Sequence, residues 1–260
     1  MRSTSLSQQS PISSNKIAIG SPELATIISY PRLTDKEYNN RLKELYSLEI
    51  KYILPAGRLK IGKIPIAGKG CVSLVLKAET KNKICALKIR RTDANRKTME
   101  MEVSLHQIAN SAGVGPSIFR YSENYIMMEF IDGLSIIDWV KQRSITADQV
   151  RNLATAILKQ CYNLDRTHID HGELSRLDHH VIVSKSNTAN IIDFESSSTQ
   201  RKSCNVTTAA QSLFISGGLI SNRVNEVLGY AKKEKNIGVL KTYKWNQNKA
   251  NFDKIIDTFC

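Results

Sequence analysis

Apolar residues between positions 50 and 130 come in short runs separated by polar turns, which is typical of β-strands. The runs predict strands at residues 51–54, 59–66, 71–78, 84–89, 117–120 and 125–130. A helix is expected among them over residues 98–110, ending before Gly113. Together these elements predict a small antiparallel sheet that carries one helix.

Beyond Gly133 the apolar positions recur at helical spacing. Thr146 and Gln149 have the spacing of a capping box, and a single apolar stripe follows them. The stripe consists of Val150, Leu153, Ala154, Ile157, Cys161 and Leu164. Further helices are expected at residues 135–142, 207–215, 220–232 and 251–259, and a short amphipathic helix, capped by Thr34, at residues 33–49. We therefore expect an α+β fold with a sheet-rich first lobe and a short, mainly helical second lobe.

The chain of 260 residues is long enough for two small lobes. Residues 1–30 begin with a stretch rich in Ser, Gln and Asn and are expected to be disordered. We assign residues 31–131 to the first lobe and residues 132–260 to the second. No apolar run approaches the roughly 20 residues that a membrane-spanning helix needs, and the first residues lack the apolar core of a secretory signal. A cytoplasmic protein without a membrane partner is expected.

The chain carries a formal net charge of +13, and basic residues dominate positions 51–97. A basic surface favours polyanions such as nucleic acid or nucleotide phosphates, although solvated surface lysines explain the excess equally well. The five cysteines are scattered and include no Cys-x-x-Cys pair, which favours reduced thiols over a disulfide framework or a zinc site.

The glycine segment and a strand lysine of the first lobe are suited to bind phosphate groups, and a helix glutamate can support the lysine. Gly68-Lys69-Gly70 lies between two apolar runs, and glycines let backbone N–H groups approach phosphate oxygens. A plain hairpin turn is the alternative explanation. Lys88 interrupts an apolar strand and needs an acidic partner if it points inward, and Glu102 on the next helix can supply one. The alternative for Lys88 and for Glu102 is an exposed position that faces solvent.

Acidic residues in the second lobe are suited to proton and metal chemistry. Glu173 follows His171-Gly172 and could accept a proton. Asp193 comes after an apolar run and is followed by Phe194, a pattern suited to a Mg²⁺ ligand, although an ordinary turn aspartate has the same pattern. We expect His171 to pack beneath its loop and to hydrogen-bond backbone. A metal cluster made by the nearby histidines matches no zinc spacing.

These residues, in this order, resemble the protein-kinase signature set. Over residues 60–215 the chain is similar to RIO-type kinases, to the compact archaeal kinase subunit of the KEOPS complex and to a group of predicted archaeal Ser/Thr protein kinases. The resemblance implies a bilobal kinase-like fold that binds ATP with Mg²⁺ or Mn²⁺ and phosphorylates a protein substrate or itself. It implies Glu173, Lys88 and Asp193 as catalytic residues and Asp178 and Asp193 as metal ligands. It implies nucleotide contacts at Gly68, Lys69, Gly70, Ser73, Val75, Ala86, Lys88, Glu102, Glu129 and Ile131.

Three residues depart from the kinase pattern: Glu173 stands in place of Asp, Asp178 in place of Asn, and Glu195 in place of Gly. Three alternatives to an active protein kinase therefore stay open. One is an ATP-binding pseudokinase that acts as a switch or scaffold. Another is a small-molecule kinase of the same fold. The third is a factor that binds RNA or a ribonucleoprotein through the basic first lobe, a role that could coexist with kinase activity.

Overall fold

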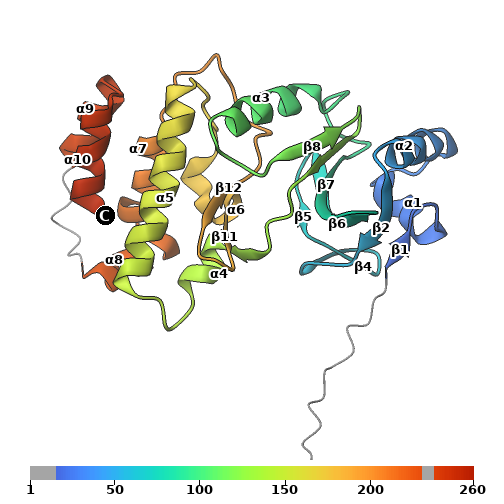
Figure 1. The fold of residues 1–260 in the computed structure, drawn as a ribbon, viewed down its shortest axis with the longest axis horizontal. Coiled ribbons are helices and arrows are strands. Elements are labelled where there is room, and N and C mark those ends of the chain that lie inside the picture. Colours follow the sequence, from blue (N-terminus) through green and yellow to red (C-terminus); the bar gives the residue numbers. More distant parts are fainter. Residues whose placement is uncertain (1–15, 230–236) are drawn as a thin grey trace, which may run out of the picture. The chain divides into compact units, whose positions relative to one another are not determined.

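The computed structural model describes residues 16–229 and 237–260. The chain divides into two compact units, residues 1–96 and residues 97–260 (Figure 1). Both units contain helices and antiparallel strands, so the expected α+β class is confirmed. The expected lobe boundary after residue 131 lies within the second unit. The kinase-like two-lobe arrangement remains a prediction.

The first unit is built around antiparallel strands in the order β1-β2-β6-β7, with β5 paired to β6. Their bounds are β1 Ile17–Ala18, β2 Ile50–Leu54, β5 Gly68–Lys69, β6 Ser73–Thr80 and β7 Ile84–Arg90. The strand predicted over residues 59–66 is a hairpin of two short strands, β3 Leu59–Ile61 and β4 Ile64–Ile66. Gly62 separates them because its φ of 56° lies in the left-handed region that glycine adopts readily.

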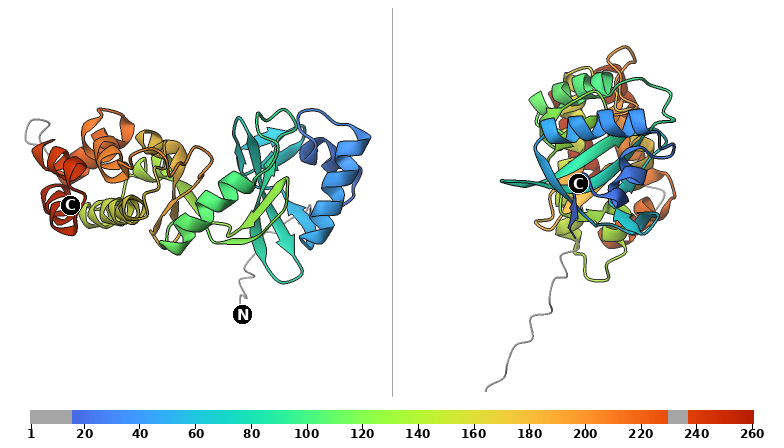
Figure 2. Two further views of the ribbon diagram at one scale, coloured as in Figure 1. Left: turned by 90° about the horizontal axis from the view of Figure 1, so that it is seen from above. Right: turned by 90° about the vertical axis from the view of Figure 1, so that its right-hand side faces the viewer.

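Two helices of the first unit precede β2: α1, Pro22–Ile28, and α2, Asp35–Ser47 (Figure 2). Leu24, Ile27 and Ile28 lie on one face of α1 and are buried. The prediction of disorder is therefore wrong for residues 16–30, while residues 1–15 lie outside the described part of the chain. The Ser-, Gln- and Asn-rich composition belongs to the first 15 residues, whereas residues 17–28 contain enough apolar side chains to bury a short helix.

Helix α2 begins as predicted, with the Thr34 side chain accepting a hydrogen bond from the backbone N–H of Glu37. Its Arg41 side chain is fully buried, which the sequence did not indicate. The guanidinium donates to the carbonyl oxygens of Ile28, at 2.7 Å, and of Arg90, and pairs with Glu37 at 2.6 Å. Arg41 therefore ties α1, α2 and the end of β7 together, and these bonds compensate the burial of its charge.

The described part of the second unit contains five short strands and most of the helices. Its strands are β8 Ile118–Tyr121, β9 Tyr125–Met128, β10 Gly133–Ser135, β11 Val181–Ser184 and β12 Ala189–Ile191. Its helices are α3 Glu100–Ser111, α4 Ile136–Val140, α5 Ala147–Arg166, η1 Leu174–Arg176, α6 Leu177–His180, α7 Asn205–Ala210, the π-helical turn η2 Gln211–Ile215, α8 Leu219–Leu228, α9 Ile237–Trp245 and α10 Lys249–Phe259. The strands β10, β11 and β12 form a small antiparallel sheet, and β8 pairs with β9.

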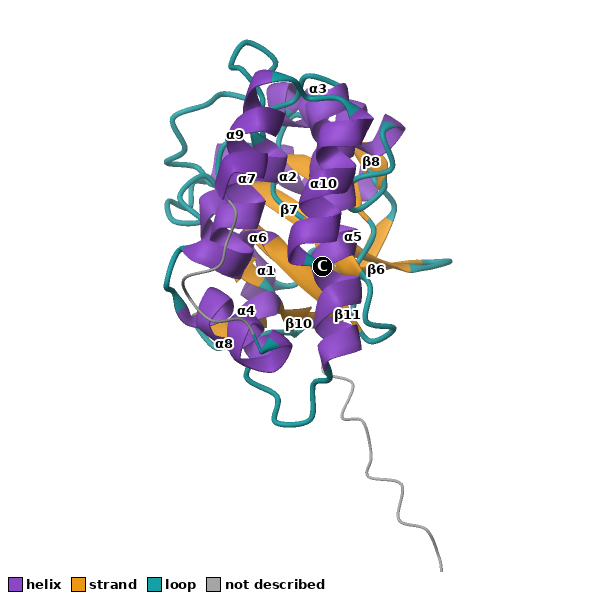
Figure 3. Ribbon diagram, turned by 90° about the vertical axis from the view of Figure 1, so that its left-hand side faces the viewer, coloured by secondary structure: helices purple, strands orange, loops and turns teal. Residues whose placement is uncertain are grey.

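Helix α5 is the central helix of the second unit, as its apolar stripe predicts. The capping box of Thr146 and Gln149 is present, and all six residues of the stripe are buried. Figure 3 shows α9 and α10 running side by side next to α5. The helix predicted over residues 207–215 is α7 continued by η2, and α10 matches the last predicted helix. Helix α9 was not predicted, and residues 230–232 of the helix predicted at 220–232 lie outside the described residues.

Among residues 16–229 and 237–260, no helix has the length and apolar character to cross a membrane.

Candidate functional site

Three side chains of the second unit that could bind a metal ion come together where the sheet β10-β11-β12 ends. Glu173 precedes the turn η1, His180 is the last residue of α6, and Asp193 follows β12. One potential ligand atom of each lies within 4.8 Å of the others. Nε2 of His180 is 3.4 Å from Oε2 of Glu173. Two predicted catalytic residues, Glu173 and Asp193, therefore belong to one cluster, together with a histidine that was not predicted.

Strand pairing explains why His180 meets Asp193. Val181, the first residue of β11, is the partner of Ile191, the last residue of β12. The backbone N–H of Ile192 then donates to the carbonyl of His180 at 3.0 Å. The hairpin thus brings together the residues just outside its open end. These are His180 before β11 and the segment that leads from β12 to Asp193.

The backbone at Asp193 is unusual, because its φ of 70° lies in the left-handed region. A non-glycine residue there is uncommon and is often found at functional sites. The next residue, Phe194, is fully buried and stacks on His106 with ring centroids 4.5 Å apart. A Cβ at Gly115 would lie 2.6 Å from the Phe194 ring, so only glycine fits beneath it. Phe194 therefore anchors the segment that carries Asp193, as predicted.

His171 lies beneath the cluster and links its two loops. The side chain is fully buried, and its Nε2 is 3.1 Å from the carbonyl oxygen of Ile192. This confirms the predicted packing and backbone hydrogen bond. Burial, reinforced by the nearby His180, lowers the pKa of His171 to about 4. His171 is therefore neutral at pH 7 and acts as a structural tie between the loops.

His180 is also held neutral, because burial lowers its pKa while Asp193 and Glu173 only partly oppose the shift. Its side chain is 6% exposed. Its Nδ1 atom is buried and has no hydrogen-bond partner among the described residues. A neutral imidazole whose Nε2 atom faces one carboxylate, with a second carboxylate nearby, has the composition of a metal-ion site.

A buried hydrogen-bond network holds residues 169–171, which lie at the start of the loop that carries Glu173. Asn205 accepts from the backbone N–H of His171 at 2.9 Å and donates to the carbonyl of Ile169 at 2.6 Å. Asp165 in turn accepts from the side chain of Asn205 at 2.8 Å and from the hydroxyl of Tyr243 at 3.0 Å. Burial raises the pKa of Asp165 although these donors oppose the shift. Asp165 and Asn205 therefore set the backbone position from which the loop reaches Glu173.

The same loop is bonded to the polar segment that follows Phe194. Asp170 and Ser198 exchange two backbone hydrogen bonds of 2.9 Å. Arg201 donates to the carboxylate of Asp170 and to the carbonyl of Ser196, both at 2.6 Å. Gly172 has a φ of 87°, and a Cβ there would lie 2.6 Å from the Arg201 guanidinium. The loops on either side of the cluster are thus held to each other.

The structure places the predicted metal ligand Asp178 outside this cluster. Its Oδ2 atom is 3.1 Å from Nε2 of the exposed His179. Asp178 and His180 are two residues apart on α6, so about 200° of helical rotation separates their side chains. His168 is also exposed and His171 is engaged with backbone, so only His180 of the four nearby histidines joins Glu173 and Asp193.

In the first unit, strand register brings predicted nucleotide-binding residues into one row. Gly68 of β5 pairs with Val75 of β6, and Val75 pairs with Lys88 of β7. Ala86 lies two residues before Lys88 and therefore on the same face of the strand. The glycine segment is a tight hairpin turn, closed by the N–H of Gly70 donating to the carbonyl of Ser73 at 2.8 Å. The hairpin and Lys88 are therefore neighbours in the sheet, and phosphate binding by them stays a prediction.

The remaining predicted residues have defined local settings. Lys69 donates to the Tyr30 hydroxyl at 2.8 Å. Lys88 and Glu102 are both buried, but Lys88 belongs to the first unit and Glu102 to the second, so their pairing remains a prediction. Glu129 is exposed directly after β9, and its backbone N–H donates to the carbonyl of Ser117. Ile131, two residues later, is half-buried.

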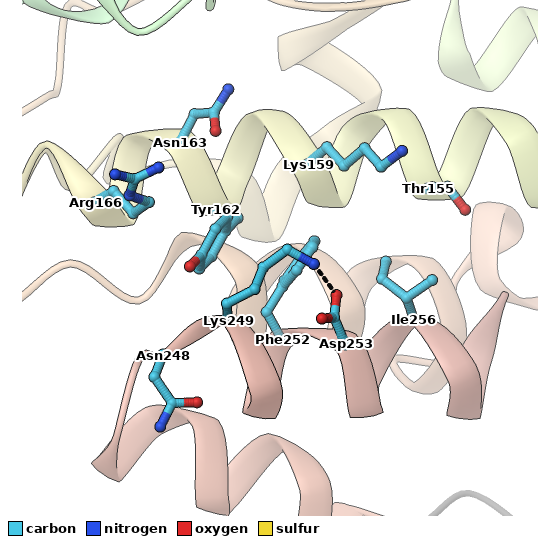
Figure 4. A pocket seen from close by; sticks show the side chains of 10 residues that line it. All are labelled: Thr155, Lys159, Tyr162, Asn163, Arg166, Asn248, Lys249, Phe252, Asp253 and Ile256. Atoms are coloured by element: carbon cyan, nitrogen blue, oxygen red, sulfur yellow. Dashed lines mark hydrogen bonds and ion pairs between the residues drawn. The ribbon is translucent and has the colours of Figure 1, made fainter.

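A separate groove lies between α5 and α10, with a volume of about 1040 Å³ (Figure 4). Tyr162 of α5 and Phe252 of α10 point toward each other and stack with ring centroids 4.4 Å apart. Lys159, Arg166 and Lys249 line its rim, and Lys249 pairs with Asp253. The stacked rings are part of the packing between the two helices. Asp165 and Glu173 are not among the residues that line this groove.

We expect acid to destabilise the protein through His171. Its folded pKa of about 4 lies below the usual value of 6.5, so the unfolded chain binds a proton more readily as the pH falls through this interval. This difference lowers the free energy of unfolding by on the order of 2 kcal/mol between pH 7 and pH 5. Urea denaturation of the wild type and of His171→Gln at both pH values measures it. An equally steep loss in the variant would assign the acid sensitivity to other groups.

Comparison with known proteins does not assign the chain to a family. No protein-family model matches it, and no curated protein matches it. The resemblance to kinases therefore stays a prediction drawn from the order of a few residues. The function has to be argued from the described side chains and their geometry.

Proposed function

We propose that this protein is an ATP-dependent phosphotransferase of the protein-kinase-like class that phosphorylates Ser or Thr of a protein substrate or of itself. The observation that carries the proposal is the grouping of Glu173, His180 and Asp193 around the bond between His171 and Ile192. Two carboxylates and an imidazole in one place are suited to hold a divalent cation and to take up a proton. Both functions are needed for phosphoryl transfer.

In this proposal Glu173 accepts the proton of the acceptor hydroxyl as its oxygen forms a bond to the γ-phosphorus. The bond between that phosphorus and the bridging oxygen breaks, and ADP leaves with its electron pair. A divalent cation such as Mg²⁺ or Mn²⁺, held by Asp193, His180 and one carboxylate oxygen of Glu173, would neutralise charge on the phosphate oxygens, and the second oxygen of Glu173 would accept the proton. The glycine hairpin and Lys88 of the first unit are the proposed phosphate contacts, because they lie in one row of the sheet.

A pseudokinase is the second candidate, and Glu173 is the residue that favours it. Glutamate stands where the kinase pattern has aspartate, and its carboxylate lies 3.4 Å from His180. An additional methylene changes the reach of the proton acceptor, and a displacement of about 1 Å can reduce a rate on the order of a hundredfold. Such a protein would bind ATP and the cation but transfer no phosphate.

Transfer of ³²P from labelled ATP with Mg²⁺ or Mn²⁺ tests the proposal, combined with thermal melting in the presence and absence of ATP. We expect label on the protein or on a generic acceptor, and its loss in both Lys88→Ala and Asp193→Asn. Lys159→Ala, in the α5–α10 groove, is the matched control and should retain the label. An ATP-dependent rise in melting temperature without label would establish the pseudokinase. Neither label nor a rise in melting temperature would overturn both candidates.

A further inference from the structure

The ligand set of the cluster differs from the one that the sequence predicts. Asp178 and Asp193 would supply oxygen ligands alone, whereas the cluster contains a histidine nitrogen beside two carboxylates. The His180 residue is 4% exposed, so its ring is fixed by packing and is not a mobile surface group. The nature of the donor atoms decides which cations a site prefers.

The ring of His180 is oriented toward the two carboxylates. Its Nε2 atom lies 3.4 Å from Oε2 of Glu173, and one potential ligand atom each of Glu173, His180 and Asp193 lies within 4.8 Å of the others. An imidazole binds a cation through one ring nitrogen, so Nε2 is the ligand atom that this arrangement offers. The two carboxylates supply two negative charges, which balance a divalent cation when the imidazole is neutral.

The spacing of the cluster fits a metal ion after small side-chain movements. Ligands about 2.1 Å from an octahedral ion lie about 3 Å apart when adjacent and about 4.2 Å apart when opposite. The contact of 3.4 Å between His180 and Glu173 is close to the adjacent spacing. The largest separation allowed within the cluster, 4.8 Å, exceeds the opposite spacing by about 0.6 Å. Rotation of the half-buried Glu173 and Asp193 side chains can close this difference.

We propose that Glu173, His180 and Asp193 form a site for a first-row transition-metal dication, that Mn²⁺ binds there in preference to Mg²⁺, and that His180 sets this preference. Mg²⁺ favours oxygen ligands and gives up its bound water reluctantly. Mn²⁺ also binds carboxylate oxygen, but as a first-row transition metal it accepts an imidazole nitrogen more readily. The role of the ion at nucleotide phosphates rests on the proposed function, but Mn²⁺ binding to the chain alone does not.

The test is an electron paramagnetic resonance titration of the full chain with Mn²⁺, without nucleotide, followed by competition with Mg²⁺. We expect one Mn²⁺ per chain, bound at least about tenfold more tightly than Mg²⁺. Pulsed measurements should detect ¹⁴N coupling from a bound imidazole. His180→Asn, which offers an oxygen, should lose the ¹⁴N coupling and most of the preference for Mn²⁺. His179→Asn is the matched control, because this exposed neighbour lies outside the cluster.

Circular dichroism shows whether His180→Asn remains folded, and His180→Gln serves as the second variant if it does not. The proposal is overturned if Mn²⁺ fails to bind stoichiometrically, or binds without ¹⁴N coupling, or keeps that coupling in a folded His180 variant. Thermal melting with ATP separates this result from the proposed function. ATP binding without nitrogen coupling would reject the His180 site alone, whereas Mn²⁺ binding with nitrogen coupling but no ATP effect would reject the nucleotide role alone.

Discussion

Replacing Asp165 by alanine is expected to lower the free energy of unfolding by about 3–5 kcal/mol. Its carboxylate accepts hydrogen bonds from the backbone N–H groups of Asn205 and Val206 and from the Tyr243 hydroxyl, at 2.9, 3.2 and 3.0 Å. Asp165 is 2% exposed, so water cannot replace it as acceptor. Alanine would leave several buried donors unsatisfied, and each such group carries a desolvation penalty. The loss should also loosen the loop that Asn205 holds through His171.

Urea denaturation of the wild type and of Asp165→Ala measures this effect. Asp148→Ala is the matched control, because Asp148 lies on the same helix and its side chain is 88% exposed. It should change stability by less than about 0.5 kcal/mol. Tyr243→Phe removes a single donor and should cost about 1 kcal/mol, which keeps the test possible if Asp165→Ala does not fold. Equal stability of Asp165→Ala and Asp148→Ala would contradict the role of the network.

Replacing Phe194 by alanine should have two consequences, of which the first is a loss of about 3–5 kcal/mol of stability. The ring is fully buried between His106 and His171, with centroid distances of 4.5 and 5.3 Å, and it lies over Gly115. Truncation leaves a cavity in the core. The second consequence is at least about tenfold weaker Mn²⁺ binding, because the backbone that carries Asp193 in its left-handed conformation loses its anchor.

Phe259→Ala separates the two consequences. Phe259 is 1% exposed and stacks on Phe214 at 5.0 Å, and neither belongs to the metal-ligand cluster. We expect a similar loss of stability in both variants, measured by denaturation at low temperature, but weaker Mn²⁺ binding only in Phe194→Ala. Unchanged Mn²⁺ affinity in folded Phe194→Ala would mean that the ring fills the core without positioning Asp193.

Much of the secondary structure could be predicted from local patterns. The capping box and apolar stripe of α5 lie within one helix, so they depend on residues close together in the sequence. By contrast, α1 was missed because the polar composition of the first 15 residues was extended to residue 30, and α9 because its amphipathic pattern is weak.

The composition of the site could be predicted only in part. Glu173 was found because it follows His171-Gly172, and Asp193 because it follows an apolar run and precedes Phe194. His180 was missed because its place opposite residue 192 follows from the pairing of β11 with β12, which apolar patterns alone do not fix. Asp178 was chosen because it stands where the kinase pattern has a metal-binding Asn. The short helix α6, however, turns the side chains of Asp178 and His180 in different directions.

The sequence by itself determined the α+β class, the order of most strands and helices, and the acidic residues that could carry chemistry, because periodicity and capping are local properties. Only the tertiary structure decided which residue joins Glu173 and Asp193, and that Asp165 and Arg41 are buried as bonding centres. These facts depend on contacts between residues far apart in the chain, such as Asp165 with Tyr243. Packing selects such contacts, and no local pattern specifies them.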